Sequence, residues 1–263
     1  MKTVLITRPP GQAAQLAELI RVALPAVHVL QIPLLTILPN EDPREAERLR
    51  EQLKKTDLAV IVSPNAVECG MRMLAGSWPK EVPIAIVGMG SQRALLHHGI
   101  DQASGYQIIA PQGQEDSEGL WAALQALNWP MQDQQVLFLK GVGGRVWLGE
   151  QFVMHGAHVY PINAYQRVTL SSEASLWDKL ATLEPSQTCC LMTSSEAARH
   201  WAQVLQKKPW GAPWFEQVQM IASHPRIMAA IEDLGFRKVS LAGSGDEAIL
   251  AATSAWYKND SLS

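Results

Sequence analysis

The part of the sequence best suited to chemistry is the glycine-rich segment Lys140-Gly141-Val142-Gly143-Gly144-Arg145. Its glycines let the backbone approach a ligand closely and point successive N–H groups at an anion, and a basic residue stands at each end. The segment lacks the Gly-Lys-Ser/Thr ending of a P-loop and the third glycine of the dinucleotide fingerprint. These residue types favour an anion-binding loop, with a flexible turn as the alternative.

Helix starts could supply further anion sites, because their free N–H groups and the positive end of the helix dipole attract carboxylate or phosphate. Serine before proline predicts an N-cap and the first helical residue, as at Ser63-Pro64, and Ser223-His224-Pro225 has the same form. Each serine alone could simply cap its helix, but several of them beside basic residues favour an anion site. The serines are Ser63, Ser91, Ser117, Ser194 and Ser223, and the basic residues at predicted strand ends are Arg8, Lys140, Arg145 and Arg167.

The sequence shows no evident metal site and no nucleophile–base pair. His155 and His158 have no second pair of ligands nearby, and the adjacent Cys189 and Cys190 would point to opposite faces of a strand. Neither a Gly-x-Ser-x-Gly elbow nor a His-Glu-x-x-His helix occurs. We therefore expect neither a metal nor a catalytic triad.

The loops need a frame of strands and helices to position them. Short aliphatic runs alternate with longer amphipathic stretches, which is typical of βαβ units around a parallel sheet. Most runs are apolar on both faces, so we expect helices on both sides of each sheet and ligands beyond the carboxyl ends of the strands. The expected strands are Val4–Thr7, Val27–Ile32, Leu58–Val62, Ile84–Val87, Gln107–Ala110, Val136–Leu139, Val159–Ile162, Cys189–Met192, Val218–Ala222 and Val239–Ala242.

The second half of the sequence repeats the first at an offset of about 130 positions, which indicates an old duplication of a five-stranded unit. The alternative is the strand–turn–helix rhythm that all doubly wound folds share. The halves meet near Asn128–Gln135, where Pro130 and polar residues predict a linker. The matching pairs are Val4–Arg8 with Val136–Lys140, His28–Ile32 with His158–Ile162, Ile61–Ala66 with Met192–Ala197, and Val87–Gly99 with Ala222–Gly235.

Composition limits the class of protein. The 263 residues can form two domains, and 47% hydrophobic with 18% charged residues argues against disorder. A net charge of −3 argues against broad binding to nucleic acid or to an anionic membrane, and no apolar run approaches the ~18 residues of a spanning helix. Three cysteines and an early polar stretch predict a soluble protein of a reducing compartment without a signal peptide.

Four segments together resemble the uroporphyrinogen-III synthase family. They are Val4–Pro9, ending in Thr-Arg-Pro; Ile61–Val67, reading Ile-Val-Ser-Pro-Asn-Ala-Val; Leu137–Arg145, the strand and glycine loop; and Gly156–Arg167, with Gly-Ala-His-Val and Tyr-Gln-Arg. The resemblance runs from residue 3 to about 253. Lys140 stands where the family usually has arginine and Ser91 where threonine is common, and Ala222–Pro225 lacks the frequent Ile-Gly.

The resemblance implies an α/β fold of two flavodoxin-like, doubly wound parallel-sheet domains, joined by a two-stranded linker with a cleft between them. One domain would hold residues 1–35 with 168–263, and the other residues 36–167, including linker strands near Leu34–Pro39 and Ala164–Thr169. The first βαβ unit would then be exchanged between the two sequence copies, so the sequence halves would differ from the domains.

The activity implied by the resemblance is cyclisation of hydroxymethylbilane, a linear tetrapyrrole, to uroporphyrinogen III and water. Ring D is inverted on the way, through an azafulvene and a spiro intermediate, without cofactor or metal. Tyr165 matches the family tyrosine proposed to assist hydroxyl departure; its alternative role is packing at a hinge. The expected substrate-binding residues are Arg8, Ser63, Asn65, Gly88, Ser91, Lys140, Gly141, Gly143, Arg145, Thr193, Ser194 and Ser223.

We therefore expect a cytoplasmic, monomeric lyase of heme biosynthesis that binds a tetrapyrrole polycarboxylate. Transient contact with porphobilinogen deaminase is expected, and no nucleic-acid or membrane partner. Two alternatives are a cytosolic two-domain protein that binds or senses a small anion, and another enzyme of the same scaffold that acts on a phosphorylated substrate. The missing P-loop and the absence of an acidic metal cluster count against the second.

Overall fold

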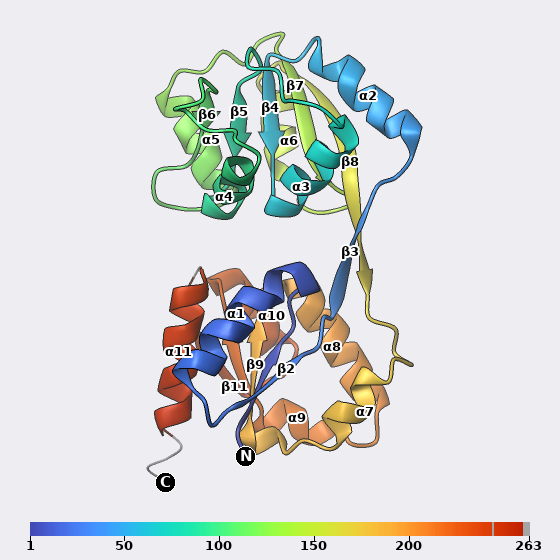
Figure 1. The fold of residues 1–263 in the computed structure, drawn as a ribbon, viewed down its shortest axis with the longest axis vertical. Coiled ribbons are helices and arrows are strands. Elements are labelled where there is room, and N and C mark those ends of the chain that lie inside the picture. The colour runs from blue at the N-terminus through green and yellow to red at the C-terminus, as the bar shows by residue number, and fades with distance from the viewer. Residues whose placement is uncertain (244, 260–263) are drawn as a thin grey trace. The chain divides into compact units, whose positions relative to one another are not determined.

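The structure is a computed structural model that describes residues 1–243 and 245–259 (Figure 1). Its contacts divide the chain into two compact units: unit 1 holds Met1–Thr36 and Val168–Ser263, and unit 2 holds Ile37–Arg167. The linker expected at 128–135 is therefore wrong, because this segment joins α5 (Ser117–Ala126) to β7 (Gln135–Gly141) inside unit 2. The repeated sequence halves do not coincide with the units.

Unit 1 is built on a five-stranded parallel sheet in the order β11-β10-β9-β1-β2. Helices α1 (Pro10–Ala23) and α11 (Asp246–Asn259) pack on one face. The other face is covered by α8 (Ser195–Lys207) and α10 (Pro225–Asp233), with the short α7 (Leu176–Ala181) and α9 (Ala212–Gln217) beside them and the one-turn η1 (Pro185–Gln187) against α9. The strands are β1 (Thr3–Ile6), β2 (His28–Gln31), β9 (Thr188–Met192), β10 (Gln219–Ala222) and β11 (Lys238–Leu241).

Unit 2 is built on a six-stranded sheet in the order β3-β8-β7-β4-β5-β6. Helices α2 (Pro43–Leu53), α3 (Pro64–Leu74) and α4 (Met89–His97) cover one face, and α5 with α6 (Trp147–Met154) covers the other. Neighbouring strands from β8 to β6 run parallel. The remaining strands are β3 (Leu35–Pro39), β4 (Leu58–Ile61), β5 (Ile84–Ile86), β6 (Ile108–Ile109) and β8 (His158–Thr169).

The expected α/β fold with two helix-covered sheets is confirmed, and each expected strand is present. The central strands β1, β4 and β9 are fully buried along their length, as strands covered on both faces must be. β8 differs, since it continues to Thr169 where the apolar pattern predicts an end at Ile162. Its second half mixes exposed polar and buried residues, so the apolar pattern does not reveal it.

The chain passes between the two units along β3 and β8, which pair with each other. Asn40 N–H donates to the Ala164 carbonyl at 2.8 Å, and Leu170 N–H donates to the Leu34 carbonyl at 2.9 Å. The residue number falls on one strand as it rises on the other, so the pair is antiparallel. The predicted two-stranded linker is thereby confirmed. Among residues 1–243 and 245–259, every helix is too short or too polar to traverse a bilayer.

Candidate functional site

Tyr165 lies at a β-bulge near the end of β7. Lys140 pairs with Asn163, but the next residue of β7, Gly141, pairs with Tyr165 and skips Ala164. An extra residue breaks the alternation of side chains between the two faces of a sheet. Ala164 and Tyr165 therefore both lie in the core that β7 and β8 share with α2, α3 and α4, and Tyr165 is 3% exposed.

The Tyr165 hydroxyl meets the N-terminus of α3. Its oxygen lies 3.1 Å from Ser63 Oγ, and Ser63 Oγ also accepts a hydrogen bond from Ala66 N–H at 3.1 Å. This bond satisfies one of the free N–H groups of the first helical turn, with Pro64 as the first helical residue. The predicted cap at Ser63 is thus confirmed, and it places a second hydroxyl beside the phenol. Such a pair can orient or pass one proton, because each hydroxyl both donates and accepts.

Gly141 makes room for the ring of Tyr165. A Cβ atom at position 141 would lie 2.6 Å from the ring carbons Cε2 and Cζ. Only glycine therefore lets the ring pack directly on the backbone of β7. Next to it, Val142 N–H donates to the Tyr165 carbonyl at 2.8 Å, which holds the strand against the bulge.

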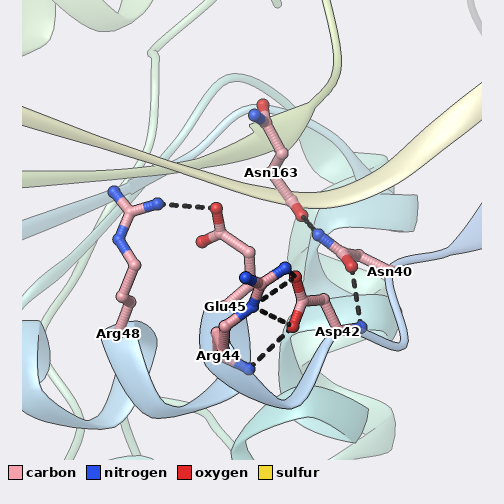
Figure 2. A network of polar contacts seen from close by, with 6 residues as sticks. All are labelled: Asn40, Asp42, Arg44, Glu45, Arg48 and Asn163. Carbon is pink, nitrogen blue, oxygen red and sulfur yellow. Dashed lines mark hydrogen bonds and ion pairs between the residues drawn. The ribbon is translucent and has the colours of Figure 1, made fainter.

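Asn40 fixes the two residues that precede Tyr165, as Figure 2 shows in part. Its backbone N–H donates to the Ala164 carbonyl and its Nδ2 donates to the Asn163 carbonyl, both at 2.8 Å. Both carbonyls belong to the bulged stretch of β8. Asn40 was not among the expected site residues; the only sequence signal for it is the turn-forming run Asn-Glu-Asp-Pro.

The same asparagine is tied to the start of α2 (Figure 2). Asn40 Oδ1 accepts from Asp42 N–H at 3.0 Å, and Asp42 caps the helix by accepting from Arg44 N–H at 2.9 Å. One turn into the helix, Arg48 forms an ion pair with Glu45 at 2.6 Å. Hydrogen bonding to Arg44 lowers the pKa of Asp42, so the capping carboxylate is charged near neutral pH.

The rest of the glycine loop leaves β7 through two residues in the left-handed region. Gly143 has φ 72° and Gly144 has φ 85°, which disfavours any side chain at these positions. The loop ends at Arg145, whose Nη1 and Nη2 lie 3.0 and 2.6 Å from the two carboxylate oxygens of Glu118 on α5. These hydrogen bonds lower the pKa of Glu118 and raise that of Arg145.

A second carboxylate lies at the N-terminus of α4. Met89 N–H donates to Glu115 Oε2 at 2.9 Å. At Gly88 a Cβ atom would lie 2.8 Å from that oxygen, so glycine leaves room for the carboxylate. The prediction that Ser91 stands at this helix start is wrong: the helix begins at Met89, and Ser91 is 2% exposed, with its N–H donated to the Gly88 carbonyl. Its place in the first turn puts it on the buried face.

Two other predicted site residues of unit 2 lie at the same strand ends. Asn65 is the second residue of α3, and Lys140 stands on β7 opposite Asn163; both are partly exposed. Unlike Arg145, Lys140 forms no ion pair with any residue that the structure describes.

In unit 1, the predicted residues lie where β1 and β9 end. Arg8 forms an ion pair with Asp246 at the start of α11, with 2.5 Å between Nη1 and Oδ1, and the side chains are 14% and 21% exposed. Ser194 caps α8 by accepting from Ala197 N–H at 3.3 Å, which confirms that cap. Thr193 precedes it and is partly exposed.

The predicted cap at Ser223 is wrong. His224 Nδ1 accepts from Arg226 N–H at 3.1 Å, and Ser223 donates its own N–H to the Met192 carbonyl. Pro225 is the first helical residue, so the cap must be the residue directly before it.

A similar shift occurs at Ser117, which is itself the first residue of α5. Asp116 caps this helix, because its Oδ1 accepts from Gly119 N–H at 3.0 Å. Aspartate is as good an N-cap as serine, so the run Asp116-Ser117 offers two candidate caps, and the aspartate is the one used.

The side chains offer little for a metal or for thiol chemistry. Across residues 1–243 and 245–259, no three His, Cys, Asp or Glu side chains gather as metal ligands would. Cys69, Cys189 and Cys190 are buried and unpaired with one another, and burial raises the pKa of each thiol. The chemistry that unit 2 does present is a pair of hydroxyls at the start of α3, and, at other strand ends, cationic and N–H groups that attract carboxylates.

Comparison with known proteins identifies the family. The uroporphyrinogen-III synthase of Escherichia coli strain K12 is 26% identical over 260 residues, which cover 95% of this chain and 99% of that enzyme. The enzyme of Salmonella typhimurium is 28% identical with the same coverage. A crystal structure of a mutant uroporphyrinogen III synthase from Thermus thermophilus matches the fold with a TM-score of 0.64 at 13% identity, covering 98% of this chain and 100% of the other. The family model described as uroporphyrinogen-III synthase HemD matches residues 15–248, so this chain belongs to the uroporphyrinogen-III synthase family.

Proposed function

We propose that this chain cyclises hydroxymethylbilane to uroporphyrinogen III and water, with inversion of ring D. The observation that carries the proposal is the family match over residues 15–248. The hydroxyl pair of Tyr165 and Ser63 lies inside this range and supports it. So do the N–H groups at the helix starts and the Arg145 guanidinium of the same unit, because the substrate is a polycarboxylate.

Tyr165 is the residue to which we assign departure of the substrate hydroxyl. In that step the C–O bond of the hydroxymethyl group breaks, the oxygen leaves with the electron pair, and a proton converts it to water. The pyrrole that carried the group gives up its N–H proton and becomes a neutral azafulvene, so that one water is lost in all, and the azafulvene then forms the spiro intermediate. Phenols are weak acids near neutral pH, so Tyr165 assists by hydrogen bonding together with Ser63.

Besides this step, the enzyme has to bind the flexible chain of four pyrroles in the folded conformation from which the ring closes, which is catalysis by positioning. We propose that carboxylates of the substrate contact loops at the carboxyl ends of the strands. Ser91 is proposed among these contacts as a residue of the first turn of α4, where its side chain is 2% exposed and its N–H is donated to the Gly88 carbonyl. The proposed contacts are Arg8, Ser63, Asn65, Gly88, Ser91, Lys140, Gly141, Gly143, Arg145, Thr193, Ser194 and Ser223.

The overall reaction releases water and changes no oxidation state, so we propose a lyase that needs no cofactor. We also propose that the domains are residues 1–35 with 168–263, and 36–167. The enzyme is proposed to be a cytoplasmic monomer that receives its substrate in transient contact with porphobilinogen deaminase, because free hydroxymethylbilane cyclises spontaneously to isomer I.

The test generates hydroxymethylbilane in situ with porphobilinogen deaminase, adds the full chain without cofactor, and separates the oxidised uroporphyrin isomers. We expect isomer III to replace the spontaneous isomer I. Isomer I alone, from protein with a native circular dichroism spectrum, would overturn the proposal. It would direct attention to the alternative, a protein that binds or senses a small anion.

A further inference from the structure

The loop before α5 and the first turn of that helix carry two glutamates, Glu115 and Glu118, that bind groups of unit 2 suited to anions. We call residues 111–118 the carboxylate strap. Glu115 accepts a hydrogen bond from Met89 N–H at the start of α4, and Glu118 pairs with both terminal nitrogens of Arg145 at the end of the glycine loop. α4 packs on one face of the sheet and α6, which follows Arg145, on the other. The strap therefore binds two groups at the carboxyl edge of the sheet: the Met89 N–H, at the start of a helix on one face, and the Arg145 guanidinium, just before a helix on the other face.

The backbone of the strap is fixed independently of these two contacts. Gln114 Nε2 donates to Asp116 Oδ2 at 2.6 Å, and Asp116 caps α5 through its other oxygen. The Gln114 carbonyl packs so closely on Gly119 that a side chain there would collide with it. The two glutamates differ from this anchor, because Glu115 is exposed and the Glu118 side chain is 40% exposed. Their carboxylates can swing into solvent while the loop stays in place.

We propose that Glu115 and Glu118 are internal competitors of the substrate carboxylates and thereby set the affinity of the enzyme for its substrate. The inference rests on the proposed function, which assigns Arg145 and the α4 helix start to substrate carboxylates. A carboxylate of the chain and a carboxylate of the substrate bind these groups through the same hydrogen bonds. Both internal contacts are solvent-exposed and hence weak, so a polycarboxylate displaces them, at a loss of affinity.

The test compares the wild type with Glu115→Gln, Glu118→Gln and the double variant. Glutamine keeps the size of the side chain and removes its charge. We expect KM for hydroxymethylbilane to fall about three- to fivefold in each single variant, with kcat unchanged, and the effects to multiply in the double variant. Glu81→Gln is the matched control, because it removes the same charge from an exposed position of unit 2; its KM should equal that of the wild type.

A mutant cycle separates competition from structural support. In the background of Arg145→Ala, Glu118→Gln should no longer lower KM, since no guanidinium remains to be released. If the glutamates only supported the loop, their removal would raise KM and lower the thermal midpoint together. A KM that rises or stays unchanged in both single variants, or a gain that survives Arg145→Ala, overturns the proposal.

A second arm measures equilibrium binding of uroporphyrin III, a polycarboxylate macrocycle, by quenching of tryptophan fluorescence. Here too the double variant should bind more tightly than the wild type, and Glu81→Gln should match the wild type. Equal Kd values in the double variant and the wild type count against the strap. If the wild type makes only isomer I, the proposed function fails. The proposal that Glu115 and Glu118 compete with bound carboxylates is then tested by the Kd for uroporphyrin III alone.

Discussion

The hydroxyl oxygens of Tyr165 and Ser63 lie 3.1 Å apart, although the two residues are 102 positions apart in the sequence. Three local features bring them together: a bulge in β8, a glycine at position 141 and the serine cap of α3. All three belong to unit 2. The geometry of the pair is therefore set by one folded unit, and each feature can be tested separately.

Tyr165→Phe should lower kcat by about 10²-fold, the lower end of the range for general acid catalysis, because the phenol assists hydroxyl departure by hydrogen bonding, and the fold should be retained. Loss of the hydroxyl removes one hydrogen bond, which costs about 1 kcal/mol of unfolding free energy. Turnover is measured by the isomer assay and stability by urea unfolding. Tyr106→Phe is the matched control, since its hydroxyl bonds to the Trp78 carbonyl in the same unit. Equal turnover in the two variants would remove Tyr165 from the proposed step.

Gly141→Ala should lower both the turnover number and the free energy of unfolding. The new methyl group would lie 2.6 Å from two ring carbons of Tyr165, so the ring must move away from Ser63. Overpacking of this kind costs about 1–3 kcal/mol. Urea unfolding and the isomer assay on the same preparation check both effects.

Gly143→Ala is the comparison for that variant. Gly143 has a positive φ but no atom within 4 Å of an added Cβ, so alanine there strains the backbone without touching Tyr165. We expect it to lose about 1 kcal/mol of stability and to keep kcat. A fall in kcat equal to that of Gly141→Ala would show that the loop acts by another route than the tyrosine ring.

The strands that position the site can be predicted from the sequence. A parallel strand that is buried on both faces consists of a continuous run of apolar residues. β1 and β4 are cases in point, with every residue buried. The cap at Ser63 can also be predicted from the sequence, because serine is a favourable N-cap and proline is favourable as the first residue of a helix.

The bulge at Ala164 has no such local signature. It depends on the pairing of β8 with β7, which are separate in the sequence, and so do the contacts of Asn40 with both carbonyls. Glu115 and Glu118 were missed for a related reason: the sequence shows which groups attract anions, but only the fold shows that the chain's own carboxylates reach them.

Asn40→Ala should lower kcat, because it removes the Nδ2 bond that holds the carbonyl two residues before Tyr165. We expect a fall of about tenfold in kcat with little change in KM, and a loss of about 1–2 kcal/mol of stability. Asp42→Ala is the control: it removes the cap of α2, at about 1 kcal/mol, without touching β8. If both variants lose stability and neither loses kcat, Asn40 has no role in positioning Tyr165.

The three cysteines should resist alkylation in the native protein. Cys189 and Cys190 are fully buried and Cys69 is 6% exposed, and burial raises the pKa of each thiol, so the reactive thiolate is scarce. Iodoacetamide at pH 8 followed by mass spectrometry should find no label on the folded chain and three labels in urea. Rapid labelling of a native cysteine would show that its sheet or helix opens on the timescale of the reaction.

The ion pair of Arg145 with Glu118 should give a small, pH-dependent contribution to stability. Hydrogen bonding to Arg145 lowers the pKa of Glu118 in the folded state. The contribution is therefore complete above the pKa of an unfolded glutamate, about 4.3, and is lost as the pH falls through the lower folded value. Both side chains are over a third exposed, at 46% and 40%, so it should stay below about 1 kcal/mol.

Urea unfolding of the wild type and Glu118→Gln, at neutral pH and then below about pH 4.3, measures this contribution. The difference in unfolding free energy between the two proteins should shrink as the carboxylate becomes protonated. In the background of Arg145→Gln the same substitution should produce no such pH-dependent difference, because the partner that lowers the pKa is gone. A difference that persists unchanged into acid would mean that Glu118 stabilises the start of α5 without its charge, through packing or hydrogen bonding alone.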